Sequence, residues 1–324
     1  MNKIDLVYPC HSKDAEVLQL CIKYARKNIK NLNNIYVVSK TKLSNDAIWI
    51  SEDSFPFSFQ DMINKIGDHH RTGWYYAGWI HLLSIIYIPN ILDNVLICDS
   101  DTVFLKPTEF VDIDGKSLFS VSPSDGTPLY YEHMYKLVPG LTPQYNMSGV
   151  CHHILINKEI MKHMIENVEK IHNKKFHDAW IDVTTENYKT NKHENKPGHI
   201  GNDRHKNGPG RATSYELYFS YAIKYFKNNV KIRPLDHILA YKGFFKVKNM
   251  NFIKPKLQSR TSKRGNYTVV SQEIENETIF DSLIECLEFH ISECRKHDFD
   301  AVTFQNHTRE GSGKITGKSH GDKR

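Results

Sequence analysis

Apolar runs bounded by turn-forming residues alternate with segments of helical periodicity through the first half of the chain. The runs predict strands, and the periodic segments predict helices. The predicted strands span residues 3–8, 34–39 and 94–98, and the predicted helices span 14–28 and 72–87. Strands that alternate with helices along a chain usually build a parallel sheet. The fold class predicted here is α/β, with a mixed, mostly parallel sheet flanked by helices.

The second half continues the pattern with longer polar interruptions. It predicts a strand at 149–157, helices at 158–173, 177–188, 213–227 and 278–296, and strands at 230–233, 267–271 and 301–304. The interval 189–211 has one isoleucine and no other large apolar side chain, so we expect a flexible loop there. Residues 310–324 are expected to be a disordered tail. The organisation predicted is one domain over 1–309 with a helical C-terminal elaboration.

Composition excludes several classes of protein. Of the 324 residues, 40% are apolar, enough for a sizeable core, and the net charge is only +6. The six cysteines are scattered without a CxxC pair, which favours reduced thiols. The basic excess is diluted along the chain, so nucleic acid is not an expected partner. No apolar run reaches the length of a membrane span or of a secretory leader, so we expect a cytoplasmic protein.

The strongest chemical signal is the segment VLICDSDTVFL, in which a buried-type strand delivers Asp99, Ser100 and Asp101 into a turn. Two carboxylates one residue apart suit Mg²⁺ or Mn²⁺. Both GT-A glycosyltransferases and haloacid-dehalogenase-like phosphatases use such a D-x-D. The phosphatases place it after their first strand, whereas about a hundred residues precede it here, which favours the glycosyltransferase arrangement.

Several ordered segments carry a family resemblance over roughly residues 4–240. They are IDLVYPCHSKD (4–14), VVSK (37–40), FPFSFQDM (55–62), R-T-GWYY (71–76), IPN (88–90), VLICDSDTVFLKP (95–107), SGVCHHILINKEIM (148–161), SYELYFSYA (214–222) and KIRPL (231–235). The chain resembles a poorly characterised family of GT-A-like glycosyltransferases from viruses and bacteria. The resemblance implies metal-dependent sugar transfer from a nucleotide donor, in the host cytoplasm if the chain is viral.

Carried over by position, the resemblance implies a divalent-metal site and a donor site. Asp99 and Asp101 would hold the metal, joined by His307. The residues implied at the donor are Pro9, His11, Lys13, Ser39, Lys40, Arg71, Trp74, Tyr75 and Ser100. An arginine at position 71 could bind a diphosphate through two parallel hydrogen bonds. The chain departs from the family in having Ala77-Gly78 where a Gln-Gln pair is expected, and His81 in place of a lysine.

Three further features each have a functional and a structural interpretation. Of the adjacent pair His152 and His153, we predict that His153 lines the sugar pocket, rather than the pair binding zinc. The aromatic cluster of Trp74, Tyr75, Tyr76 and Trp79 is either core or a sugar-binding surface. Glu216 is either the base that deprotonates the acceptor or a favourable first-turn residue of a helix capped by Thr213 or Ser214.

The sequence thus predicts an enzyme that uses Mn²⁺ or Mg²⁺ to transfer a sugar from a nucleotide-diphosphate sugar, a UDP-sugar by preference, to a hydroxyl of a glycan, protein or small molecule. One alternative is a magnesium phosphohydrolase with Asp99 as nucleophile and Asp101 as acid/base. Another is a non-catalytic carbohydrate-binding protein. The basic loop 189–211 is predicted to close over the donor as a lid, with a passive surface insertion as the alternative.

Overall fold

The computed structural model describes residues 2–68, 72–122, 128–190, 212–241, 257–259 and 280–305. Arg71, His307, the strand predicted at 267–271 and the predicted tail lie outside these ranges. So do residues 191–211, which hold almost all of the predicted lid.

A five-stranded sheet forms the centre of the molecule, in the order β3-β2-β1-β4-β7. Its strands are β1 (Ile4–Pro9), β2 (Leu32–Ser39), β3 (Ile48–Ser51), β4 (Asn94–Cys98) and β7 (His153–Asn157). The first four are mutually parallel, and β7 runs antiparallel to β4. The predicted mixed, mostly parallel sheet is confirmed.

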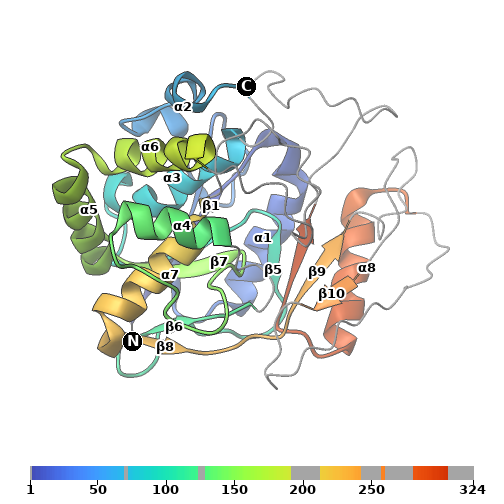
Figure 1. The fold of residues 1–324 in the computed structure, drawn as a ribbon. Coiled ribbons are helices and arrows are strands. Elements are labelled where there is room, and N and C mark those ends of the chain that lie inside the picture. Colours follow the sequence, from blue (N-terminus) through green and yellow to red (C-terminus); the bar gives the residue numbers. More distant parts are fainter. Residues whose placement is uncertain are drawn as a thin grey trace, which may run out of the picture.

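Helices cover both faces of this sheet, as Figure 1 shows. Successive side chains of β4 enter opposite cores: Val95 and Ile97 pack on one side, and Leu96 and Cys98 on the other. The first core is completed by helices α3 (Thr72–Tyr87), α5 (Lys158–His172), α6 (Phe176–Thr190) and α7 (Ser214–Tyr225). The second core receives α1 (Ala15–Asn28) and α8 (Leu283–Lys296). Burial on both faces explains why the strands read as continuous apolar runs.

The C-terminal part contains the predicted helix, the strand predicted at 301–304 and further strands. A second sheet has the order β10-β9-β11-β5, with β5 at Thr102–Phe104, β9 at His237–Tyr241, β10 at Leu257–Ser259 and β11 at Ala301–Gln305. Strand β11 runs antiparallel to β5, and the Phe304 amide donates to the Asp101 carbonyl at 2.8 Å. The end of the described chain therefore lies beside the D-x-D turn. Strands β6 (Ser117–Phe119) and β8 (Val230–Ile232) form a separate parallel pair.

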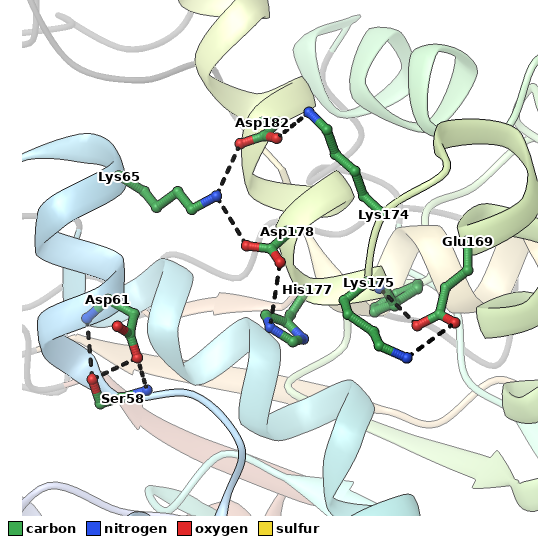
Figure 2. Close-up of polar contacts among 10 residues, drawn as sticks. Ser58, Asp61, Lys65, Glu169, Lys174, Lys175, His177, Asp178 and Asp182 are labelled. Carbon is green, nitrogen blue, oxygen red and sulfur yellow. Dashed lines mark hydrogen bonds and ion pairs between the residues drawn. The ribbon is translucent and has the colours of Figure 1, made fainter.

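Helix α2 (Phe59–Ile66) is fixed to α6 by charged side chains (Figure 2). It begins at a capping box in which Ser58 and Asp61 exchange hydrogen bonds. Near its other end, the Lys65 ammonium lies 2.9 Å from Asp178 Oδ1 and 3.4 Å from Asp182 Oδ1, both on α6. These partly exposed contacts join α2 to α6 and add to their packing.

The sequence-based expectation missed the short strands β3, β5, β6, β9 and β10, and it differs from the structure around β7 and α4 as well. The strand predicted over 149–157 begins only at His153, because His152 has a left-handed backbone (φ 61°) that cannot continue a strand. Helix α4 (Pro128–Leu137) was not predicted. It packs the buried residues His133, Met134 and Leu137 toward the rest of the protein.

Candidate active site

A pocket opens at the carboxyl ends of β1 and β4. The chain passes from β1 to β2 on one side, and β4 lies on the other side of β1, so this edge is the switch point where open α/β sheets bind ligands. The pocket is lined by Pro9, Trp74, Ala77, Gly78, His81, Asp99, Ser100, Asp101, Trp180, Ala212, Thr213, Ser214 and Tyr215.

Asp99 is held by two side chains from distant parts of the sequence. Its Oδ2 lies 2.7 Å from His152 Nδ1, and its Oδ1 accepts a hydrogen bond from the Tyr215 hydroxyl. His81 Nε2 is 3.8 Å from the same Oδ1. An ionised carboxylate only accepts, so Nδ1 of His152 carries the proton in that contact. The carboxylate is thereby fixed in one orientation.

The backbone of His152 is also unusual. Its φ of 61° lies in the left-handed region, which is uncommon for a residue with a side chain. The turn lets the His152 carbonyl accept from the Asp99 amide at 2.9 Å while its ring reaches the Asp99 carboxylate. Such strain is typical of functional sites, where the surrounding structure maintains it.

The two carboxylates of the D-x-D are electrostatically unlike. Burial raises the pKa of Asp99, but the hydrogen bond and charge of His152, together with His81 and Tyr215, outweigh it and leave the pKa below its usual value. Burial, and then the charge of Asp99, raise the pKa of Asp101 well above its usual value. One carboxylate is therefore stabilised as an anion, whereas Lys13 and a backbone hydrogen bond do not offset the burial of the other.

The donor set fits a divalent cation. Oδ1 of Asp101 is buried without a hydrogen-bond partner among the described residues, an arrangement that a bound cation would compensate. Asp99 retains lone pairs beyond those used by Tyr215 and His152. Within the described ranges, no three or more His, Cys, Asp and Glu side chains come together as a metal site. Further ligands would be water and phosphate oxygens, as Mg²⁺ sites commonly use.

Helix α7 brings its N-terminus to the same pocket. Thr213 precedes the helix and makes no side-chain capping hydrogen bond, while Ser214 Oγ lies 2.9 Å from His81 Nδ1. Burial lowers the pKa of His81, and the nearby Asp99 only partly opposes this. The pocket wall thus combines hydroxyls and a neutral imidazole with the positive end of a helix dipole.

The structure brings only some of the predicted donor residues to the pocket. Pro9, Trp74, Ser100 and both aspartates of the D-x-D line it. The other candidates within the described ranges do not line it. Tyr75 is fully buried, and the His11 ring accepts from the Lys13 amide as the cap of a short 3₁₀ helix. Ser39 donates to the Thr41 carbonyl, and Lys40 is exposed.

Neither histidine of the adjacent pair is among the residues that line the pocket. His153 Nε2 lies 2.9 Å from Ser120 Oγ, and the residue is buried away from the pocket lining. Its neighbour His152 makes the contact with Asp99 instead. Strand alternation does not govern this pair, because β7 begins at His153 and His152 lies in the turn before it.

Glu216 lies one residue beyond the pocket wall, with its side chain 1% exposed. Oε2 accepts from Ser148 Oγ at 2.5 Å and from Gly149 N at 2.8 Å, and Oε1 accepts from Ser220 Oγ at 3.0 Å. Burial raises the pKa of Glu216, and the three hydrogen bonds oppose that rise. Glu216 is not among the residues that line the pocket, and it joins α7 to the segment before β7. Its predicted role as base stays a prediction.

Comparison with known proteins adds little. No protein-family model and no curated protein matches the chain. Among solved structures, the apo form of mouse xyloside xylosyltransferase 1 is similar at 10% sequence identity and a TM-score of 0.37, over 76% of this chain and 88% of that chain. A likeness this distant carries no argument about activity. Among the described residues, no helix has the length and apolarity needed to cross a membrane.

Proposed function

We propose that the protein is a glycosyltransferase that transfers a sugar from a nucleotide-diphosphate sugar, preferentially a UDP-sugar, to a hydroxyl acceptor. The pocket at the β1/β4 switch point would hold the donor, and Asp99 and Asp101 would hold Mn²⁺ or Mg²⁺. The bound cation would stabilise the negative charge that develops on the departing diphosphate.

One observation carries this proposal: the buried, unpartnered Oδ1 of Asp101 in a pocket that also receives the N-terminus of α7. A bound cation would compensate the buried carboxylate, and a helix N-terminus attracts an anion. A ligand that supplies both is a divalent cation bound to a diphosphate, which is the reacting part of a nucleotide sugar. The family resemblance of the sequence supports the same chemistry.

Six further predicted residues have tasks in this proposal. His11 and Lys13 follow β1, and Ser39 and Lys40 end or follow β2, so the nucleoside would extend along this edge of the sheet. Strand β11 ends two residues before His307, close to the Asp101 backbone, which keeps His307 a candidate third ligand. Arg71 remains a candidate partner of the diphosphate.

The test is a donor-cleavage assay with a panel of nucleotide sugars. In Mn²⁺ we expect release of nucleoside diphosphate, abolished by EDTA and by Asp101→Asn. The matched control is Asp93→Asn, which alters an exposed carboxylate just before the opposite end of β4 and should leave release unchanged. Release of free phosphate would favour the phosphohydrolase, and sugar binding without cleavage would favour the carbohydrate-binding protein. Failure to cleave any donor of the panel would contradict the proposal.

A further inference from the structure

The structure separates the aromatic cluster of α3 into core and surface. Tyr75, Tyr76 and Trp79 are at most 2% exposed and belong to the core. Trp74 is 40% exposed, and it also lines the pocket. A large apolar side chain that stays exposed at a pocket is a candidate contact for a ligand.

Neighbouring rings hold the Trp74 indole in place. Its plane lies 22° from that of Tyr130 on α4, with 6.3 Å between ring centroids. It also meets Tyr75 edge to face, at 5.0 Å and 76°. Both arrangements are favourable for aromatic pairs. The exposed indole is therefore a pre-oriented flat surface, which reduces the entropy lost when a ligand stacks on it.

The walls of the pocket differ in chemistry around this surface. The indole supplies an apolar face, whereas Thr213, Ser214 and His81 supply hydroxyl and imidazole groups. A pyranose ring matches both kinds of wall, because its C–H groups form an apolar face and its hydroxyls point outward around the rim. In the proposed function, the carboxylates of Asp99 and Asp101 bind the cation, and the cation binds the diphosphate.

We propose that Trp74, oriented by Tyr130 and Tyr75, is the stacking platform for a pyranose ring of the acceptor, so that the acceptor is a carbohydrate. The assignment of that ring as acceptor rests on the proposed function. Trp74 keeps 40% of its surface in solvent, so it lies where an incoming molecule arrives, whereas a donor diphosphate would be held at the buried D-x-D. The acceptor hydroxyl would then approach the donor from the Trp74 side.

The test measures glycoside binding without donor. The probes are methyl β-D-galactopyranoside, methyl β-D-glucopyranoside and methyl α-D-mannopyranoside, measured by saturation-transfer NMR titration. Trp74→Ala should weaken binding of at least one glycoside by about tenfold, and Trp74→Phe should retain most of it. The control is Trp49→Ala, which removes a tryptophan that is also 40% exposed but lies on edge strand β3, and it should bind as wild type.

A second measurement follows ligand binding in the wild-type protein and needs only Trp74→Phe, for assignment. The chain has four tryptophans, so its ¹⁵N spectrum contains four indole N–H signals. The Trp74 signal, assigned from Trp74→Phe, should shift most when glycoside is added. Equal glycoside binding by wild type and Trp74→Ala, or an unshifted Trp74 signal, would overturn the platform.

The assay also distinguishes other outcomes. If binding of uridine depends on Trp74 and binding of the glycosides does not, the Trp74 indole stacks on a nucleobase. That result would overturn the proposal. Glycoside binding that needs Trp74, in a protein that cleaves no nucleotide sugar, would refute the glycosyltransferase function and leave only a carbohydrate platform. Donor cleavage combined with glycoside binding independent of Trp74 would refute the platform alone.

Discussion

His133 should make the protein sensitive to mild acid, through its contact with the helix that carries Trp180. The ring of His133 is fully buried, lies 5.3 Å from the Trp180 ring, and contacts the Trp180 carbonyl through Nε2 at 3.0 Å. Burial lowers the pKa of His133 from 6.5 to about 4; the carbonyl contact opposes this, and the charges of His172 and Lys136 add to it.

The sign of the effect follows from where the proton binds. Below pH 6.5 the unfolded chain takes up a proton at position 133, but the folded protein does not until the pH approaches about 4. His133 therefore does not lower the free energy of unfolding well above pH 6.5. As the pH falls from about 6.5 toward about 4, it lowers this free energy progressively. For these two pKa values the loss between pH 7.5 and pH 5 is about 2 kcal/mol.

His133→Gln isolates this contribution, because glutamine can still donate to the Trp180 carbonyl but does not titrate. Urea unfolding at pH 7.5 and pH 5 gives the change in the free energy of unfolding for each protein. The variant should be less stable at pH 7.5 but should lose about 2 kcal/mol less than wild type on going to pH 5. His297→Gln, at an exposed histidine after α8, should lose as much as wild type. Equal losses in wild type and His133→Gln would refute the reasoning.

Three further changes test packing, surface charge and the cation. Gly149→Ala should lower the free energy of unfolding in urea by about 1–3 kcal/mol, because a Cβ there would lie 2.4 Å from the Phe219 side chain. An unchanged free energy would contradict that close approach. Lys65→Met should cost less than about 1 kcal/mol, since Lys65 and Asp178 are each 36% exposed, and a larger loss would show a stronger ion pair. Asp101→Asn should abolish the rise in Tm that Mn²⁺ plus UDP gives wild type, and an undiminished rise would place the cation elsewhere.

Local sequence patterns predicted the parts of the fold that depend on local forces. Strand β4 and helix α3 have the predicted bounds, because an apolar run between polar residues and a helix stopped by Pro89 are local signals. Helix α4 was missed although Pro128 stands at its first position, a common place for proline, and buried residues recur at helical spacing after it. The start of β7 could not be predicted, since it depends on the left-handed turn at His152.

The site divides in the same way. Asp99 and Asp101 were recognisable because the strand and the two carboxylates are adjacent in the chain. Tyr215, which donates to Asp99, is 116 residues away, and no local signal links the two. Trp180 is also far from Asp99 in the sequence, and the pattern around it predicted only a helix. The Glu216 side chain points into the interior, where it accepts hydrogen bonds from Ser148 and Gly149. Only tertiary packing brings these two residues close to it.

The most direct test of the central claim is a crystal structure of the protein with Mn²⁺ and UDP, in which anomalous scattering locates the metal. The account predicts one manganese peak about 2.1 Å from Asp101 Oδ1, close to a magnesium–oxygen distance, with the diphosphate of UDP on the same ion. It also predicts the diphosphate inside the pocket, facing the N-terminus of α7. A peak remote from Asp101, or a diphosphate bound outside the pocket, would contradict the account.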